Sequence, residues 1–464
     1  MNFYDDLRYK NLPNLQTHPS RLFVLGRLAG LDPAPVETCR VLELGTSEGA
    51  NLIGMAVGLP HAQFTGIDVA LEPVARGQRA IDDLGLQNVR LLRMDVLEID
   101  KSLGEFDYIL THGIYGWTPP AVGEKVLDIA GQCLSANGIA FVSYNTMPAG
   151  HIRKLVREMM LYHAGRFENP AERLEKARAF LSVLAAGRPE PEAFDLAAAS
   201  YAGVLLEHSD SALFHDDLAP VYEPVYFHEF VARAAAHNLQ YAGEASGFDA
   251  PRNLKPEAME AARTLAAGDR IAEQQYLDFL RMRGFRQSLL CRHEACLATE
   301  WNAGRITGCY VATTAVEAED GAFIIADSDK VRMTTSHPVP VEYMRRLIAA
   351  RPLSIRVAPE DADIALALFK VGILELHGTP GIARPAGQNP CASRLARYQA
   401  ARGESTVTTL WHRALEVGDD EARRMLTLLD GTRDREALRE AMNCAREKLE
   451  SELWLLGRHG LLVG

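Results

Sequence analysis

The stretch Val41-Leu-Glu-Leu-Gly-Thr-Ser-Glu-Gly-Ala-Asn51 decides the fold of this chain. Its first residues are those of a buried strand, two glycines follow, and a helical pattern begins at Asn51. Gly45 and Gly49 allow a tight turn with positive φ and let a ligand come close to the backbone. The N–H groups of the first helical turn offer donors to a polar ligand. The stretch therefore predicts a strand, a ligand-binding turn and a helix in succession.

An acidic residue, Asp68, ends the next predicted strand, 63–67. An acid at that place in a β-α-β unit can accept hydrogen bonds from both hydroxyls of a ribose. Ser47 stands where a dinucleotide site has its middle glycine, and the carboxylates of Glu43 and Glu48 would repel a pyrophosphate. The same carboxylates suit a cationic ligand. S-adenosylmethionine, which carries a sulfonium and an ammonium, is therefore favoured over NAD as the cofactor.

Further motifs are distributed along the chain from residue 16 to residue 432. The series comprises Glu43-x-Gly45-x-x-x-Gly49-Ala-Asn51, Asp68, Asp95 in Arg-Met-Asp-Val, Phe106-Asp-Tyr-Ile-Leu110, Gln16-Thr-His-Pro19, His112-Gly-Ile-Tyr-Gly-Trp117, Ser143-Tyr-Asn-Thr-Met-Pro148, Glu223-Pro-Val-Tyr-Phe-His-Glu-Phe230, Phe285-Arg-Gln-Ser-Leu-Leu-Cys291 and Leu428-Leu-Asp-Gly-Thr432. The series resembles the motifs of a class I methyltransferase. It is most similar to the bacterial protein-lysine methyltransferases with a regulatory domain, described for rickettsial outer-membrane proteins. Thr46 stands where relatives usually have Cys, and Met147-Pro-Ala-Gly-His151 departs from the usual Tyr-Pro-Gly-Trp-His. The second change bears on the shape of the acceptor pocket more than on the cofactor site.

The resemblance also implies which residues hold S-adenosylmethionine. The loop backbone and Glu43 would bind its amino-acid portion, and Asp68 its ribose. Asp95 would accept from the adenine amine, although a cap of its own loop is the alternative for this residue. The N-terminal segment would contact the carboxylate. The expected cofactor-binding residues are His18, Arg21, Glu43, Gly45, Thr46, Gly49, Asn51, Asp68, Val69, Met94, Asp95, Val96 and His112.

Residues after the fourth and fifth predicted strands are the candidates for methyl transfer, because reacting groups in an open α/β sheet gather beyond the carboxyl ends of the strands. The predicted catalytic residues are His112, Tyr115, Trp117, Tyr144 and Asn145. Aromatic faces attract a sulfonium or a methylated ammonium, and Tyr144 or His112 could hydrogen-bond the incoming amine. Packing over the following prolines is the alternative for Trp117. A later polar group is expected to form an internal network and one rim of the acceptor cleft: His215, Asp217, Glu223, Tyr226 and His228.

Composition limits the class of protein. A chain of 464 residues with 47% hydrophobic and 24% charged residues should fold into two to four globular domains. A formal net charge of −12 argues against nucleic-acid partners. Seven scattered cysteines fit a reducing cytosol, so a cytoplasmic location is expected. We expect no signal peptide, no membrane insertion and no metal, and we take the cluster Cys291-Arg-His-Glu-Ala-Cys296 as structural.

The order of the elements predicts an α/β fold: a Rossmann-like methyltransferase core, a helical middle domain and C-terminal winged-helix-like modules. Strands are expected at 41–45, 63–67, 88–92, 106–111 and 138–144, with helices at 48–58, 72–84, 121–134 and 151–164. The predicted domains are a lid segment (1–40), the cofactor-binding core (41–165), a helical regulatory or substrate domain (166–300), a winged-helix-like module (301–378), a linker (379–392) and a second such module (393–464).

The function predicted from these features is transfer of a methyl group from S-adenosylmethionine to lysine side chains of a protein or peptide. A small-molecule N- or O-methyltransferase is the alternative, and a non-enzymatic regulator that binds the cofactor is the second. The large C-terminal half favours a macromolecular substrate. We expect the modules after residue 378 to serve the substrate and not the cofactor; a homodimer is left open.

Overall fold

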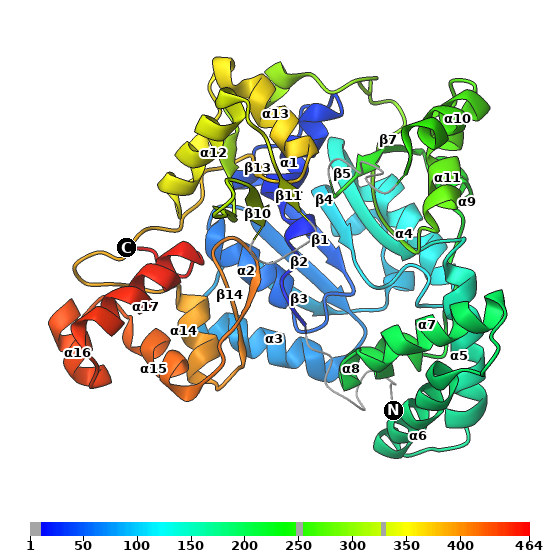
Figure 1. Cartoon of the computed structure of the whole chain (residues 1–464), viewed down its shortest axis with the longest axis horizontal. Helices are drawn as coiled ribbons and strands as arrows, with labels where there is room; N and C mark the ends of the chain where they lie inside the picture. The colour runs from blue at the N-terminus through cyan, green and yellow to red at the C-terminus, as the bar shows by residue number, and fades with distance from the viewer. Residues whose placement is uncertain (1–10, 247–253, 326–330) are drawn as a thin grey trace.

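The computed structural model describes residues 11–246, 254–325 and 331–464 (Figure 1). The first ten residues, which begin the predicted lid and carry the N-terminus judged not to be a signal peptide, lie outside the described residues. At the centre is a seven-stranded sheet with the order β3-β2-β1-β4-β5-β7-β6. Its parallel strands are β1 (Arg40–Leu44), β2 (Gln63–Asp68), β3 (Val89–Arg93), β4 (Phe106–Thr111) and β5 (Leu134–Asn145). The predicted Rossmann-like core is confirmed.

Both faces of the parallel strands are buried, as expected for a sheet covered by helices on each side. Successive residues of β1 alternate between two hydrophobic clusters, Val41 in one and Leu42 in the other. The helices α1 (Pro19–Leu28) and α2 (Ala50–Gly58) pack on the first face, and α4 (Pro120–Cys133) and α9 (Phe227–Ala236) on the second. Helix α3 (Leu71–Asp83) joins α2 on the first face.

Two antiparallel strands extend the sheet beyond β5: β7 (Phe285–Arg292) and then β6 (Leu239–Glu244). The prediction of a helical domain over residues 166–300 is therefore wrong for these two strands, which belong to the central sheet. The sequence concealed β7 because Arg286 and Ser288 are polar and yet fully buried. Helices α10 (Pro256–Ala266) and α11 (Arg270–Arg281) lie between the two strands in sequence.

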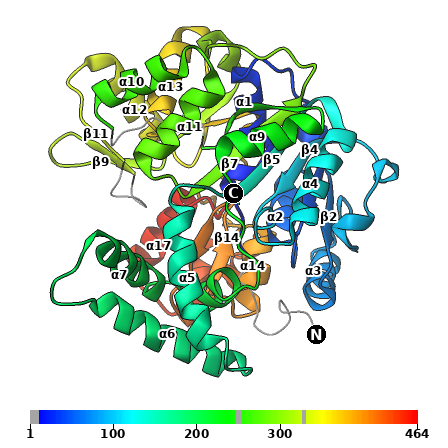
Figure 2. The same cartoon turned by 90° about the vertical axis from the view of Figure 1, so that its right-hand side faces the viewer.

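A helical arm of α5 (Gly150–Ala164), α6 (Pro170–Ala186) and α7 (Ala193–Leu206) projects from the core and has a hydrophobic cluster of its own (Figure 2). After α7 the chain forms one helical turn, α8 (Asp210–Ala212), which continues into a π-helical turn, Leu213–Asp217. π-turns of this kind frequently occur at functional sites. This one returns the chain to the carboxyl edge of the sheet.

Residues 301–378 pack directly against the core, because Val311 and Phe369 belong to the same hydrophobic cluster as Val41 of β1. The region contains β8 (Tyr310–Ala312), β9 (Ala315–Glu317), β10 (Phe323–Ile325), β11 (Arg332–Met333), α12 (Pro338–Ala350), β12 (Ile355–Arg356), α13 (Ala362–Lys370) and β13 (Glu375–His377). Its strands form two small antiparallel sheets, β11-β10-β9 and β12-β8-β13. The winged-helix character of this region stays a prediction.

The C-terminal module has a separate core. It consists of α14 (Arg394–Ala401), β14 (Thr406–Thr408), β15 (Ala414–Glu416), α15 (Asp420–Leu428), α16 (Arg435–Met442) and α17 (Arg446–Arg458). Strands β14 and β15 form a hairpin, because the chain turns back between residues 409 and 413. In Figure 1 this module and the helical arm lie on opposite sides of the sheet.

A buried arginine ties the antiparallel strands to the helices. Arg286 on β7 forms ion pairs of 2.7 Å with Glu244 on β6 and with Asp278 on α11, and its side chain is fully buried. Its guanidinium also lies 3.8 Å from the ring centre of Phe227 on α9. Removal of one partner of a buried ion pair leaves the other charge without compensation, which is strongly destabilising.

We predict that Arg286→Met lowers the free energy of unfolding by about 3–5 kcal/mol. Urea unfolding followed by circular dichroism measures the change. Arg345→Ala is the matched control, because its ion pair with Glu317 lies at the surface and its loss should have little effect. Equal losses in the two variants would contradict a special role for the buried pair.

Candidate functional site

A cavity of about 1150 Å³ opens at the carboxyl ends of β1, β2 and β4, where the strand order reverses. Open α/β sheets bind their ligands in this crevice. Distant parts of the chain line it, among them the N-terminal segment 11–16, the glycine loop after β1, the loops after β2, β3 and β4, the π-helical turn, and residues from both regions after 300. The cavity is large enough for a cofactor and part of an acceptor.

The glycine loop has the strained backbone that its sequence predicts. Gly45, Ser47 and Gly49 all have positive φ values. A Cβ atom on Gly45 would lie 2.2 Å from the side chain of Ile114, so the position admits no side chain without movement. Gly45 and Thr46 line the cavity, whereas Gly49 does not: it caps α2 and faces Leu91.

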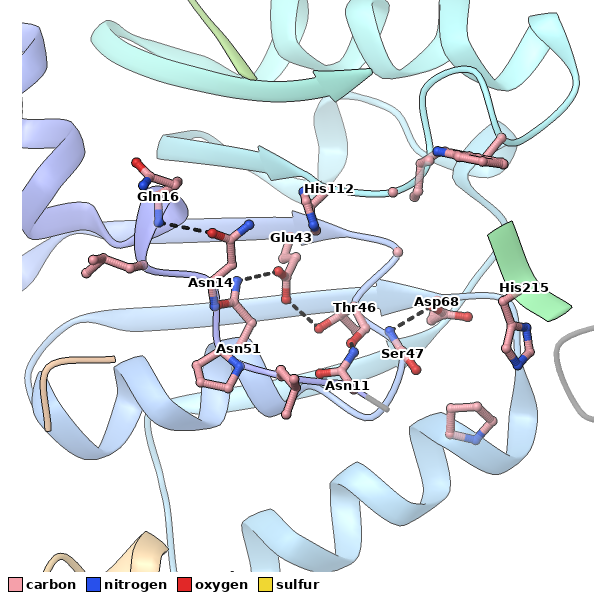
Figure 3. Close-up of a pocket in the computed structure, with 18 of the residues that line it drawn as sticks. Asn11, Asn14, Gln16, Glu43, Thr46, Ser47, Asn51, Asp68, His112 and His215 are labelled. Carbon is pink, nitrogen blue, oxygen red and sulfur yellow. Dashed lines mark hydrogen bonds between the residues drawn. The ribbon is translucent and has the colours of Figure 1, made fainter. Parts of the chain in front are cut away.

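The carboxyl group of Glu43, at the end of β1, lies beneath this loop and is 5% exposed. It accepts hydrogen bonds from the hydroxyl of Thr46 (2.7 Å) and the amide of Asn51 (2.6 Å), as Figure 3 shows. Burial raises the pKa of Glu43 to about 7, and the charge of Asp68 adds to the rise. A buried carboxyl that titrates near neutrality suits an ammonium ligand, which would stabilise its charged form.

The two acids after β2 and β3 both line the cavity. Asp68 accepts from the backbone N–H groups of Ser47 (2.8 Å) and Ala70 (2.9 Å), so it fixes the glycine loop relative to the start of α3. Asp95 accepts from the N–H of Leu97 (2.9 Å), which is the capping role considered as its alternative. Asp95 therefore caps its loop and also faces the cavity. Val69 and Val96 line the cavity too, whereas Met94 packs against the core.

The described part of the predicted lid crosses the glycine loop. The side chain of Asn11 accepts from the N–H of Ala50 (3.0 Å) and donates to the carbonyl of Thr46 (3.3 Å). The N–H of Asn14 donates to the side chain of Asn51 (2.9 Å). These two asparagines were not predicted as site residues, because a polar run before a helix carries no periodic signal.

Glu48 contributes less negative charge to the glycine loop than its sequence position predicts. It forms an ion pair with Arg76 at 2.9 Å, so its charge is largely offset. The expectation that Glu48 favours a cationic ligand is corrected by this pair. The preference for a cation rests on Glu43 and Asp68 instead.

Two of the five predicted catalytic residues, His112 and Trp117, line the cavity. The Nδ1 atom of His112 lies 2.9 Å from the hydroxyl of Ser143, and burial lowers its pKa, so the ring is neutral at pH 7. One face of Trp117 is covered by the guanidinium of Arg153 at 4.9 Å, and its ring packs at 5.2 Å from that of Tyr222. Only the remaining surface of the indole is available to a ligand.

The other three predicted catalytic residues, Tyr115, Tyr144 and Asn145, do not line the cavity. The prediction is corrected for these three. Tyr144 is fully buried, stacks on Phe230 at 4.1 Å and bonds the hydroxyl of Ser288 at 3.0 Å. Tyr115 is 3% exposed and packs edge-on against the same phenylalanine. Asn145 accepts from Arg153 at 3.3 Å. The reason is the unforeseen strand β7, which makes β5 an interior strand and buries the end predicted to be a rim.

Of the two cofactor-binding residues predicted in the N-terminal segment, one lines the cavity and one does not. Arg21 lines the cavity and donates to the carbonyls of Ala245 and Ser246, both at 3.0 Å. His18 does not line it: its side chain caps α1, and its ring lies 5.1 Å from that of His412.

The π-helical turn brings His215 and Asp216 to the cavity. His215 was expected at the rim, whereas Asp216 was missed. Asp217 belongs to the predicted internal network, since it is fully buried and pairs with Arg153 at 2.7 Å. Glu223, Tyr226 and His228 are not among the residues that line the cavity.

The C-terminal module also reaches the cavity, contrary to the expectation that it would serve the substrate alone. His412, Arg413 and Ala414 line the cavity together with Phe369 and Glu375. Arg413 forms an ion pair with Glu375. Burial favours a raised pKa for Glu375, but Arg413 and other cations outweigh it and hold the pKa at about 2. No sequence pattern predicts these contacts, because these residues lie more than 300 positions after the glycine loop in the sequence.

Comparison with known proteins agrees with this geometry. Three family models match the chain: a methyltransferase domain over residues 41–138, a predicted methyltransferase regulatory domain over 209–292, and a PKMT C-terminal winged helix domain over 388–455. An uncharacterized protein of Rickettsia prowazekii (strain Madrid E) is 33% identical over 238 residues, which cover 50% of this chain and 93% of that protein. The chain belongs to the class I methyltransferases that carry a regulatory domain.

A second uncharacterized protein of the same organism is 29% identical to this methyltransferase over 494 residues, covering 97% of this chain and 87% of the relative. The structure of PKMT2 from Rickettsia typhi covers 98% of this methyltransferase and 100% of that chain, with 24% identity and a TM-score of 0.85. The two proteins therefore share their fold over the whole length. The family model over residues 388–455 also confirms the predicted winged helix at the C-terminus.

S-adenosylmethionine is the cofactor of this methyltransferase. The cavity fits it: Gly45 exposes backbone at the cavity wall, and the buried Glu43 in the same wall matches an ammonium. Among residues 11–246, 254–325 and 331–464, no group of acidic, histidine or cysteine side chains is arranged to hold a metal ion. No helix in the described part of the chain is long and apolar enough to cross a membrane.

We predict that the affinity for S-adenosylmethionine rises with pH between about 6 and 8. The pKa of Glu43 is raised to about 7 in the folded protein, so stability falls as the pH rises from about 4.3, the pKa of an unperturbed Glu, to about 7, above which the buried carboxylate is ionised at full cost. An ammonium bound beside it favours that form, and the dissociation constant should fall roughly tenfold across this range. Calorimetry at each pH measures it.

Glu43→Gln is the matched control for this titration. The affinity of this variant for S-adenosylmethionine should be lower. Any pH dependence of binding that remains belongs to the amino group of the ligand itself, which titrates near ~8. Parallel pH profiles for the two proteins would contradict the role of Glu43.

Proposed function

We propose that this methyltransferase adds methyl groups to lysine side chains of a protein or peptide. The observation that carries the proposal is an acidic residue of the regulatory domain, Asp216, that lines the same cavity as the glycine loop. Burial raises its pKa to about 6, although Arg153 works against the rise. Asp216 is therefore ionised at pH 7, and a carboxylate with few competing waters attracts a cationic acceptor.

The comparisons support a protein acceptor. The family that matches the C-terminal module and the similar Rickettsia typhi protein both carry the name PKMT, and the motifs of this chain resemble those of protein-lysine methyltransferases. The regulatory domain contributes His215 and Asp216 to the cavity. Parts of the chain outside the cofactor-binding core thus reach the place where an acceptor would enter.

The residues of the chain have distinct tasks in this reaction. When bound, S-adenosylmethionine supplies a methyl group whose C–S bond breaks as the N–C bond to the amine forms. The acceptor enters as an ammonium with a pKa near ~10.4 and must release one proton before it reacts. Asp216 attracts and orients it. His112 stays neutral, so it adds no positive charge to a cavity that holds two cationic groups. Its orientation is fixed by Ser143.

A transfer assay tests the proposed acceptor. We expect S-adenosylmethionine with an isotopically labelled methyl group to label the protein fraction of a cell lysate, and hydrolysis of that fraction to yield labelled methyl-lysine. A lysate whose lysine amines have been acetylated is the control and should take up no label. Label confined to small molecules, or to residues other than lysine, would overturn the proposal.

A second prediction concerns the charge of Asp216. Asp216→Asn should raise the KM for the protein acceptor by roughly tenfold, because one charge interaction of about 1.4 kcal/mol corresponds to that factor. The dissociation constant of S-adenosylmethionine should change less than threefold. In the unaltered enzyme the same rise in KM is expected as the pH falls below 6, where Asp216 takes up a proton.

Asp210→Asn is the matched control. Asp210 lies in the same domain, but its exposed carboxylate pairs with Arg178 and does not line the cavity. Steady-state kinetics at fixed ionic strength should show an unchanged KM for this variant. An equal KM for the Asp216 and Asp210 variants would contradict an acceptor-binding role.

A further inference from the structure

We propose that His412 of the C-terminal winged-helix module is a positioning residue for cofactor binding, which acts through Asn51 on the carboxyl group of Glu43. The inference concerns the cofactor end of the cavity. It requires S-adenosylmethionine binding but no particular acceptor, so it stands whether or not lysine is the substrate.

Two short hydrogen bonds connect the three side chains. The Nε2 atom of His412 lies 2.7 Å from the Oδ1 atom of Asn51, and the Nδ2 atom of Asn51 lies 2.6 Å from a carboxyl oxygen of Glu43. All three side chains are at most 5% exposed. The C-terminal module is therefore linked to a carboxyl group of the cofactor site through a single residue, Asn51.

The chemistry of the groups fixes the direction of both bonds. An ionised carboxylate only accepts, so Asn51 must present its amide N–H₂ to Glu43 and its oxygen to His412. Burial lowers the pKa of His412 to about 3, which keeps the ring neutral. A neutral imidazole has one N–H, and here that N–H must lie on Nε2. His412 and the backbone N–H of Asn14 therefore both hold the oxygen of Asn51 in place and turn its N–H₂ toward Glu43.

Asn51 is the point at which separate parts of the chain meet. Besides Glu43 and His412, it bonds the backbone N–H of Asn14 (2.9 Å) and the hydroxyl of Thr17 (3.0 Å). Its oxygen accepts from both the N-terminal segment and the C-terminal module. Without the imidazole donor, the oxygen would lose one of these two donors, and the amide would be held less firmly in the orientation that turns its N–H₂ toward the carboxylate.

The backbone on both sides is built to admit the imidazole. His412 has a φ of 58°, an uncommon conformation for a residue other than glycine, in the turn between β14 and β15. Opposite it on α2 stands Gly54, and a Cβ atom there would lie 3.0 Å from the ring nitrogen Nδ1. A glycine within a helix costs about 1 kcal/mol relative to alanine. The absent side chain leaves the ring its path to Asn51.

His412→Phe tests the proposal, because it keeps a ring of similar size and removes the donor. We expect the dissociation constant of S-adenosylmethionine to rise roughly tenfold, and the midpoint of its pH dependence to move upward from about 7. The shift has this sign because the bond from Asn51 lowers the pKa of Glu43, and weakening that bond raises it. His412→Gln, which restores an N–H donor, should regain most of the affinity. His459→Phe, at the surface of the same module, is the control and should change neither quantity.

A double-mutant cycle separates positioning from packing. If His412 acts through Asn51, His412→Phe should weaken binding less than twofold when Asn51→Ala is already present. Calorimetry on all four proteins, with thermal unfolding to confirm that each is folded, gives the coupling. Three outcomes would overturn the proposal. The affinity for S-adenosylmethionine could be unchanged in His412→Phe, or His412→Phe could lower it equally with Asn51 and with Asn51→Ala. The third is that His412→Phe and His412→Gln lower it equally. If the Phe variant does not fold, His412→Leu is compared with His412→Gln under the same criteria.

Discussion

Burial of the Glu43 carboxyl group at the end of β1 is the constraint on which the rest of the site depends. A carboxylate withdrawn from water is costly unless hydrogen-bond donors replace the lost solvent. Here the donors come from Thr46 in the glycine loop and Asn51 on α2. Asn51 is in turn held by Asn14, Thr17 and His412. The lid segment, the glycine loop and the C-terminal module are thereby arranged around one titratable group.

The core of the fold could be predicted because its determinants are local. The strand, the glycine turn and the helix around Gly45 follow one another in sequence, and each has a composition that favours its conformation. The same holds for Asp68, which ends β2, and Asp95, which follows β3, because both face the cavity as the carboxyl ends of strands in such a sheet do. Strand β7 is the counterexample. Its polar Arg286 is acceptable in the interior only because Glu244 and Asp278 are present, and no periodic pattern reveals partners so placed.

The acceptor side shows the consequence of that one missed strand. Once β7 pairs with β5, Tyr144 is enclosed by Phe230 and Ser288, and the rim moves to the loop after β4 and to the π-helical turn. Asp216 and His412 enter the site from distant parts of the chain, by packing of whole modules. A single sequence indicates candidates for chemistry, but it does not show which modules dock together, since that depends on the fit of complete surfaces.

The charges around the cavity act together to favour cationic ligands. Five carboxylates and three arginines line it: Glu43, Asp68, Asp95, Asp216 and Glu375, with Arg21, Arg76 and Arg413. Two of the arginines are matched by acids, Arg413 by Glu375 and Arg76 by Glu48. The remaining field is negative and favours cations. Methyl transfer removes the sulfonium charge from the cofactor, so the field holds the product less strongly than the substrate. The negative field that favours the sulfonium form of the cofactor thus also favours release of the spent cofactor.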